Sequence, residues 1–245
     1  MINASVYAIV QNEEKHIERM LKSVADFAEI IIVDSGSTDK TLEIARNYTD
    51  KIYYKKWNNY AEQKEFAKNL CTNEWVLNLD GDEELSNELK NEIKQTIQND
   101  DIDGLEIKIA TLYLGKWTHK WTKHIQRIRF FRKKCGFYPE KLIHESIDFK
   151  GKSKLASGII KDYGTQNLEI HINKINKYSS LRADEKIAKN KKSSLLKLVF
   201  IFPTIFIKSY FIRKNFLNGK SGFIGSMINA FYAFLKEAKL YEKSL

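Results

Sequence analysis

Apolar runs of strand length alternate with segments of helical periodicity through the first hundred residues. Residues 6–10 and 30–33 are continuously apolar or nearly so, as in strands buried on both faces, and residues 17–24 have apolar side chains at helical spacing. The same patterns predict further strands at 52–54 and 75–79 and further helices at about 61–70 and 85–97. This order predicts an α/β protein with a mainly parallel sheet and helices on both faces.

The pattern changes after about residue 100. Residues 105–109 and 127–130 alternate between apolar and charged side chains, which is typical of strands with one solvent-facing side. Between them, residues 112–123 carry Trp117 and Trp121. These rings either stack on a sugar or pack inside the protein, and the sequence leaves both interpretations open.

From residue 186 onward, lysines are mixed with large apolar side chains. Residues 198–207 carry no charge but contain Pro203, and residues 221–235 are also uncharged. Because a spanning helix needs about 20 predominantly apolar residues, we expect neither segment to cross a bilayer. The basic flanks and the phenylalanines indicate helices that lie in a membrane interface. The alternative is a pair of helices packed on the rest of the protein.

The chain contains 41 Lys and Arg against 31 Asp and Glu, a formal net charge of +10. A charge of this size favours an anionic partner, which is nucleic acid, anionic lipid or a phosphorylated substrate. The first residues show no secretory signal. Cys71 and Cys135 lack metal-site spacing, which fits free thiols in a reducing compartment. We therefore expect a cytoplasmic protein.

The strongest chemical signal is Asp80-Gly81-Asp82, directly after the apolar run at 75–79. Gly81 keeps the turn tight, and the two carboxylates are hard ligands suited to Mg²⁺ or Mn²⁺ beside a diphosphate. A calcium loop is excluded because its sixth position requires glycine and Glu83 stands there. The remaining alternative is an acidic helix N-terminus, in which these carboxylates face the helix dipole.

Two further polar segments follow predicted strands. Residues 11–14 follow the first strand, and Asp34 ends the second. Open α/β sheets bind ligands at the carboxyl ends of their strands, so these positions are candidates for a binding site. The alternative for Asp34 is an ordinary turn residue.

Together these segments resemble family 2 glycosyltransferases of the GT-A fold, and within them the bacterial lipopolysaccharide-core β-1,4-glucosyltransferase branch. The resemblance covers nearly the whole chain, and the order and spacing of its motifs make it specific. It is carried by residues 9–13 (Ile-Val-Gln-Asn-Glu), 32–39 (Ile-Val-Asp-Ser-Gly-Ser-Thr-Asp), 67–69 (Ala-Lys-Asn), 80–83 (Asp-Gly-Asp-Glu), 129–132 (Arg-Phe-Phe-Arg) and 144–145 (His-Glu).

The resemblance implies a site for a nucleotide sugar, usually a uridine one, and a divalent metal, Mg²⁺ or Mn²⁺. The positions that match the nucleotide-sugar-binding residues are Val10, Asn12, Glu13, Asp34, Lys68 and Asp80. The metal ligands are Asp80 and Asp82, and Asp162 is a third where family members commonly carry a histidine; His171 falls on the following helix instead. In such enzymes the metal neutralises the departing diphosphate.

The resemblance also implies a general base on the acceptor side. An inverting enzyme needs a carboxylate that takes the proton of the acceptor hydroxyl during attack. Glu145, in the pair His144-Glu145, matches this position, and the alternative for it is an ordinary structural carboxylate. Asp148, Glu140 and Asp162 are the nearby carboxylates that compete for the role.

We therefore expect a GT-A catalytic domain at 1–185, with a nucleotide-sugar half at about 1–100 and an acceptor half at about 101–185, and a basic amphipathic helical extension at 186–245. The expected reaction moves a hexose, glucose from UDP-glucose, onto a membrane glycolipid such as lipopolysaccharide core. The protein would lie on an anionic membrane surface, the inner face of the cell membrane. Alternatives are another UDP-sugar for a capsule or protein-linked glycan, and a non-catalytic protein that binds lipid or nucleic acid. The second leaves the Asp80 turn without a role, so we expect no nucleic-acid partner.

Overall fold

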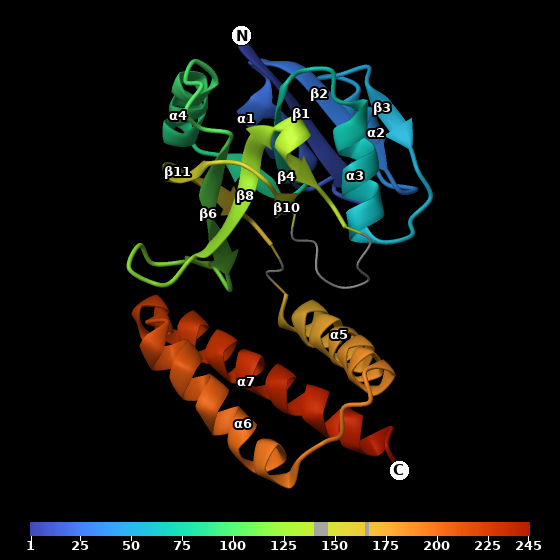
Figure 1. The fold of residues 1–245 in the computed structure, drawn as a ribbon, viewed down its shortest axis with the longest axis vertical. Helices are drawn as coiled ribbons and strands as arrows, with labels where there is room; N and C mark the ends of the chain where they lie inside the picture. The colour runs from blue at the N-terminus through green and yellow to red at the C-terminus, as the bar shows by residue number, and fades with distance from the viewer. Residues whose placement is uncertain (140–146, 165–166) are drawn as a thin grey trace. The chain divides into compact units, whose positions relative to one another are not determined.

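The computed structural model describes residues 1–139, 147–164 and 167–245 (Figure 1). Backbone contacts divide the chain into two compact units. We call residues 1–111 with 125–164 the sheet unit, and residues 112–124 with 165–245 the helical unit. The helical unit therefore includes a segment that leaves the sheet unit and returns to it.

Four parallel strands form the first half of the sheet unit, in the order β3-β2-β1-β4. These strands and the helices between them are β1 (Ile2–Val10), α1 (Ile17–Val24), β2 (Phe27–Asp34), α2 (Thr41–Ala45), β3 (Ile52–Tyr54), α3 (Tyr60–Leu70) and β4 (Trp75–Asp80). The predicted α/β architecture is confirmed. Continuous apolar strands specify it because both faces of each strand must be covered.

The second half continues the same sheet from β4 in the order β8-β6-β11-β5. The β6–β11 pair is parallel, and the other pairs here are antiparallel. The elements are β5 (Glu83–Leu85), α4 (Asn87–Ile97), β6 (Gly104–Tyr113), β8 (Ile125–Arg132), η1 (Lys133–Cys135), β9 (Gly136–Phe137), β10 (Asp148–Phe149) and β11 (Ser153–Asp162). The short strand β7 (Lys116–Trp117) pairs with the last two residues of β6 and belongs with them to the helical unit. The two strands predicted from alternating charge are neighbours, β6 and β8.

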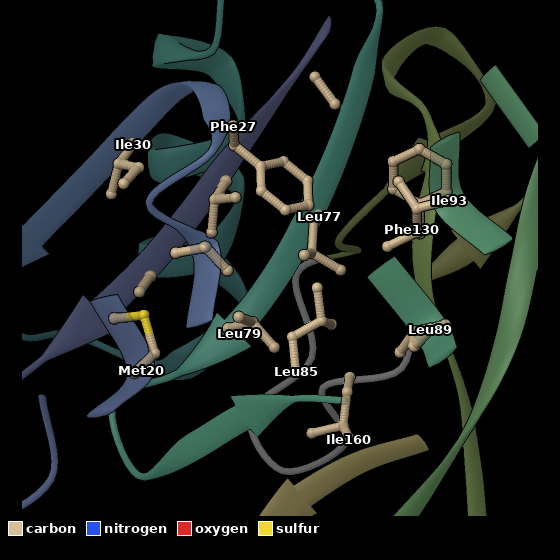
Figure 2. Packing of buried hydrophobic residues seen from close by; sticks show 14 of the residues in the cluster. Met20, Phe27, Ile30, Leu77, Leu79, Leu85, Leu89, Ile93, Phe130 and Ile160 are labelled. Atoms are coloured by element: carbon tan, nitrogen blue, oxygen red, sulfur yellow. The ribbon is translucent and has the colours of Figure 1, made fainter. Parts of the chain in front are cut away.

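Buried apolar side chains cover both faces of the sheet, because successive residues of a strand point to opposite sides. Figure 2 shows one cluster, which includes Leu77 and Leu79 of β4 and Leu89 of α4. A second cluster includes Tyr7 of β1 together with Ala61 and Ala67 of α3. The helix α4 approaches β11 very closely, since a Cβ at Gly158 would lie 2.3 Å from the backbone nitrogen of Leu89.

The helical unit is built from α5 (Leu168–Ala188), α6 (Leu195–Ile207), the π-helical turn η2 (Lys208–Ile212), the short helix η3 (Asn215–Asn218) and α7 (Gly219–Glu242). Both α5 and α6 pack along α7 (Figure 1). Lys186 Nζ of α5 lies 2.8 Å from Glu237 Oε2 of α7, and Lys239 Nζ of α7 donates to Asn176 Oδ1 at 2.6 Å. An ion pair and a hydrogen bond therefore join the first and last helices of the unit.

This arrangement differs from the expected boundary at residue 185. The sheet unit ends at residue 164, because α5 pairs with α7 through the contacts just described. Residues 112–124 also belong to the helical unit. The His119 N–H donates to Asn218 Oδ1 at 2.7 Å, and the Lys123 N–H donates to the Arg213 carbonyl at 3.1 Å. Contacts between segments a hundred residues apart leave no mark in sequence periodicity.

The apolar helix of this unit is longer than the sequence suggested. It continues from α6 through η2, and Leu195–Ile212 forms 18 residues with a mean hydropathy of 1.8. By length and composition this helix is able to cross a membrane. Our expectation considered only the uncharged residues 198–207, whereas the helix includes Lys197 and Lys208 outside them. The position of these lysines bears on whether it spans a bilayer or lies along one.

Candidate active site

The parallel strands bring three predicted site residues to one edge of the sheet. Strand β1 lies between β2 and β4, with Val10 opposite Asp34 and Ile9 opposite Asp80. Parallel strands end on the same side, so Val10, Asp34 and Asp80 share the carboxyl edge. Open α/β sheets bind their ligands at this edge.

The loops after β1 and β2 hold each other in place. Asn12 has a φ of +57°, a conformation that asparagine tolerates better than most residues. Its Oδ1 accepts from the Thr38 N–H at 2.8 Å, and its own N–H donates to Ser37 Oγ at 3.0 Å. The Glu13 N–H donates to Thr41 Oγ1 at 2.7 Å. Asn12 and Glu13 therefore belong to a fixed polar loop.

Asp34 is buried at the end of β2. Its carboxylate accepts from the Gly36 N–H at 2.8 Å and from Ser37 Oγ at 2.6 Å. Gly36 has a φ of +105°, which favours glycine because other side chains would clash. Asp34 thus has the turn role that was its alternative, and it also lies at the carboxyl edge of the sheet.

Gly81 lies against the loop that follows β1. A Cβ at Gly81 would come within 2.9 Å of Glu13 Cγ and 3.4 Å of Val10 Cγ1. Any larger residue would displace the Glu13 side chain, so the close approach requires glycine. This contact places two predicted nucleotide-binding residues against the predicted metal-binding turn.

Two buried cations bind Asp80. Lys64 Nζ of α3 lies 2.9 Å from Asp80 Oδ1, and Arg129 Nη2 of β8 lies 3.0 Å from Asp80 Oδ2. Burial by itself would raise the pKa of Asp80, but the charges of Lys64 and Arg129 outweigh burial and hold that pKa well below its usual range. Asp80 is therefore ionised at neutral pH, and its charge is already compensated by the protein.

Glu83 ties this turn to β8. Its Oε1 accepts from Arg129 Nη2 at 2.8 Å, and its Oε2 accepts from the Asp80 N–H at 2.8 Å. Burial raises the pKa of Glu83 to about 8, opposed by the Arg129 charge and reinforced by the Asp80 charge. Glu83 lies in β5, and α4 begins at Asn87 after Ser86, so the acidic residues are not a helix N-terminus.

A cavity of about 410 Å³ opens beside this cluster. Its lining includes Lys64, Asp80, Glu106, Arg129 and Tyr138. The volume falls in the range of small-molecule sites, and the polar side chains suit a ligand rich in hydroxyl groups. Among the described residues, Arg129 Nε is buried without a hydrogen-bond partner, so the cluster leaves a donor unused.

The lysine of α3 that contacts the site is Lys64 and not the predicted Lys68. Lys68 is buried, its Nζ donates to the Gly136 carbonyl at 2.6 Å, and it pairs with Glu65 at 2.8 Å. The two lysines are four residues apart and share a helix face. A helix that follows a strand begins at the carboxyl edge of the sheet, so the earlier lysine lies nearer the site. The order of the two lysines along α3 is visible in the sequence, but the prediction of Lys68 was based on the family resemblance alone.

The acidic turn also joins β11. The Asp82 carbonyl accepts from the Tyr163 N–H at 3.0 Å, and Asp162 is opposite Glu83 in the β5–β11 pair. Asp162 Oδ2 accepts from Thr111 Oγ1 at 3.1 Å, and burial raises the pKa of Asp162. The predicted third carboxylate is thus next to the turn, although it is 80 residues away in the sequence.

The donors at this turn fit a magnesium-like cation. Within residues 1–139, 147–164 and 167–245, no three His, Cys, Asp or Glu side chains form a metal-binding group. Mg²⁺ does not need such a cage, because it is usually held by one or two carboxylates together with substrate phosphates and water. Asp80 and Asp82 would supply those carboxylates, because a carboxylate oxygen that accepts one hydrogen bond keeps a further lone pair.

The predicted base, Glu145, lies outside the described residues, as do His144 and Glu140. The strands before and after residues 140–146, β9 and β10, pair in an antiparallel ribbon. Asp148 lies in β10 and is exposed. Of the competing carboxylates, the structure therefore describes Asp148 and Asp162.

The fold and the polar carboxyl edge are those of a GT-A glycosyltransferase. The family model Glycosyl transferase family 2 matches residues 5–150. The chain belongs to this family, and it is a glycosyltransferase. The match includes the strand-end loops and the Asp80-Gly81-Asp82 turn, and it ends before the helices α5, α6 and α7.

Relatives extend the similarity over the whole chain. An uncharacterized glycosyltransferase of Rickettsia typhi is 37% identical over 259 residues, which covers 100% of this chain and 89% of the relative. The lipopolysaccharide core biosynthesis glycosyltransferase LpsC of Rhizobium meliloti is 33% identical over 248 residues, 98% of this chain and 92% of LpsC. The crystal structure of S. aureus TarS 1–349 with UDP-GlcNAc superposes with a TM-score of 0.51 at 17% identity, over 93% of this chain and 79% of TarS 1–349.

Proposed function

We propose that this glycosyltransferase transfers a hexose, with inversion, from a UDP-sugar to a membrane glycolipid such as lipopolysaccharide core, and that the donor is UDP-glucose. The observation that carries the proposal is the Asp80-Gly81-Asp82 turn, which shares the carboxyl edge with Asp34 and two buried cations. The role in lipopolysaccharide core biosynthesis of the Rhizobium relative LpsC and the UDP-GlcNAc bound to TarS support it.

In this proposal the loops after β1 and β2 hold the nucleoside. Val10, Asn12, Glu13 and Asp34 surround the position where the two loops meet. The hydrogen bonds between these loops preorganise the site, so less conformational entropy is lost when the nucleotide binds. The cavity beside Asp80 then receives the sugar.

A divalent cation, Mg²⁺ or Mn²⁺, would be held by Asp80 and Asp82, with Asp162 as a further ligand. When bound, it supplies positive charge to the diphosphate leaving group. Lys64 and Arg129 act on the same charge from the protein side, because both lie at the cavity and both already pair with Asp80. Glu83 keeps Arg129 and the Asp80 backbone in register through two hydrogen bonds.

The reaction needs a base on the acceptor side. The acceptor hydroxyl oxygen forms a bond to the anomeric carbon, the bond from that carbon to the diphosphate oxygen breaks, and the hydroxyl proton moves to a carboxylate. We assign that carboxylate to Glu145, with Asp148, Glu140 and Asp162 as the competitors.

Calorimetric titration with UDP and a panel of UDP-sugars, with Mn²⁺ or with EDTA, tests the donor and the metal together. We expect UDP-glucose to bind in Mn²⁺ and the affinity to fall sharply in EDTA. Equal affinity in both conditions removes the metal from the mechanism. Tighter binding of another UDP-sugar would make that sugar nucleotide the donor in place of UDP-glucose. It would favour the capsule or protein-linked glycan alternative if the matching acceptor also reacts.

Glu145→Gln tests the base, since the amide keeps the shape and loses the basicity. Turnover of donor and acceptor should fall by about 10²–10⁴ while UDP-sugar affinity stays constant. Asp148→Asn, Asp162→Asn and Glu140→Gln are the matched variants. Normal turnover in Glu145→Gln with a loss in one of these reassigns the base and leaves the donor site as proposed.

With such an acceptor, we infer that the enzyme lies on the cytoplasmic face of the cell membrane as a peripheral protein. The non-catalytic alternative, a basic protein that binds nucleic acid, predicts strongly salt-dependent affinity for any DNA duplex and no transfer activity. Duplex binding measured at two salt concentrations separates the two.

A further inference from the structure

The excess positive charge of this protein is confined to one segment. Residues 186–236 contain 10 Lys and Arg and no Asp or Glu, so the remaining residues contain 31 of each sign. The segment includes α6, η2, η3 and most of α7. A concentration of charge of this kind favours an extended anionic surface over a small anion.

The same segment presents a large apolar face. Seven large apolar side chains on the α6–η2 helix are each 52–77% exposed: Leu195, Leu196, Val199, Phe200, Ile207, Phe211 and Ile212. Only 6% of this 18-residue stretch is buried. Apolar patches of this extent on a folded protein usually mark a surface that contacts a partner or a membrane.

The basic side chains border this face. Lys197 and Lys208 interrupt the apolar helix, and Arg213 and Lys214 follow it; all four are exposed. Long basic side chains lay their methylene stems along apolar surface while their charged ends reach anionic groups. Apolar side chains with basic residues beside them match the two layers of an anionic bilayer surface, the acyl chains and the phosphates.

A tryptophan loop, residues 117–123, lies at the basic end of the helix. Its Lys123 N–H donates to the Arg213 carbonyl at 3.1 Å. Trp121 is 66% exposed, and Lys120 Nζ lies 5.3 Å from its ring centre. Exposed tryptophan beside lysine is typical of the membrane–water interface, because the ring is apolar and its N–H is a donor.

We propose that the α6–η2 helix and Trp121 form one surface that binds an anionic lipid bilayer, with the helix lying along the membrane. This inference deepens the proposed location of the enzyme. The lysines favour this orientation over a spanning one. Lys197 and Lys208 are separated by about 16 Å along the helix, roughly half the thickness of the hydrocarbon layer, so a spanning helix would place them inside it.

The binding test uses the full chain and vesicles of phosphatidylcholine with or without phosphatidylglycerol. We expect co-sedimentation that requires phosphatidylglycerol and weakens as salt increases. Binding should shift the tryptophan fluorescence to shorter wavelength, and Trp121→Phe should remove most of that shift. Equal binding to neutral vesicles, or a shift that persists in Trp121→Phe, contradicts the proposal.

Charge and apolar variants test the two parts of the surface. The double variant Lys197→Gln, Lys208→Gln should bind about 30-fold more weakly, at about 5-fold per lysine. Lys40→Gln with Lys152→Gln removes the same charge from exposed positions of the sheet unit and should bind normally. Leu196→Gln with Phe200→Gln should also weaken binding, whereas Leu155→Gln, at an exposed apolar position of the sheet unit, should not.

Calorimetric titration of each variant with UDP separates this proposal from the proposed reaction. A folded variant that no longer binds vesicles should still bind UDP with wild-type affinity. Two outcomes would overturn the assignment of this face to a bilayer surface along which the helix lies. Self-association in the absence of lipid, abolished by Leu196→Gln with Phe200→Gln, assigns the face to a second copy of the chain. Protein that stays in cell membranes after high-salt and alkaline washes has a spanning helix.

Discussion

The two ends of the parallel strands each hold a buried carboxylate cluster, and the clusters behave differently. At the amino end, Glu29 accepts hydrogen bonds from Ser5, from Lys51, and from the Thr72 N–H at 2.7 Å and Thr72 Oγ1 at 2.9 Å. Burial opposes ionisation of Glu29, but these donors outweigh burial and lower its pKa to about 2. This cluster is closed, because neighbouring side chains and backbone fill its acceptor positions.

At the carboxyl end, Asp80 and Glu83 share Arg129, and their pKa values move in opposite directions. The cluster borders a cavity, and Arg129 Nε lacks a partner among the described residues. Paired carboxylates whose environments separate their pKa values are common at active sites. The comparison shows that a buried ion cluster becomes a functional candidate when it is open to a ligand.

The largest expected effect comes from Asp82→Asn. If the open cluster binds a metal diphosphate, turnover should fall by about 10³, since one hard ligand beside the leaving group is lost. UDP affinity in Mn²⁺ should fall with it, while the melting temperature changes little. Transfer assays and calorimetry check this, with the exposed Asp101→Asn as the control. Wild-type turnover in Asp82→Asn would show that the turn has only a structural role, like the Glu29 cluster.

Glu29→Gln should cost stability and leave catalysis unchanged. A pKa lowered from 4.5 to about 2 corresponds to about 3 kcal/mol of unfolding free energy at pH 7. The contribution of Glu29 is present above pH 4.5 and is lost as the pH falls toward 2, so the variant should lack this part of the acid destabilisation. Denaturant unfolding at several pH values checks it.

Glu18→Gln provides the matched control for that measurement, because its ion pair with Lys22 is exposed on both sides. Exposed pairs contribute roughly 0–1 kcal/mol. The comparison of the two clusters fails if Glu29→Gln lowers kcat per folded molecule, or if its stability loss matches that of Glu18→Gln.

The smallest effect separates the two lysines of α3. Lys64→Gln should reduce turnover by about 10–100-fold, because Asp80 loses one of its positioning partners. Lys68→Gln should instead lower stability by about 1–3 kcal/mol, since the Gly136 carbonyl is left without its donor, and change kcat little. Kinetics and thermal unfolding of both variants decide this. Loss of UDP binding in Lys68→Gln alone would restore the position that the resemblance implied.

Local patterns predicted much of the first half of the sheet unit. Apolar runs ending in Asp34 and Asp80 predicted both the strands and the edge at which they end, because burial on two faces and strand length are local properties. The sequence also predicted that Gly81, between the two carboxylates, keeps the turn tight. That Gly81 lies against Glu13 is known only from the structure.

The part of the chain after residue 100 was predicted less completely. The expected limit at residue 185 was displaced because α5 is held by α7, and residues 112–124 join the helical unit through hydrogen bonds to Arg213 and Asn218. The sequence left two interpretations open for the tryptophan loop. Trp121 is exposed in the structure, and this depends on contacts between segments about a hundred residues apart in the sequence.

The sequence by itself determined the fold class, the family and the acidic turn, since each depends on short local patterns and on the order in which they follow one another along the chain. The tertiary structure decided which charges meet. It placed Lys64 against Asp80, joined Arg129 to Asp80 and Glu83 from three different strands, and brought Asp162 beside the turn. The physical reason is that pairing energies and pKa values depend on distances of a few ångströms, which strand register fixes and local sequence does not.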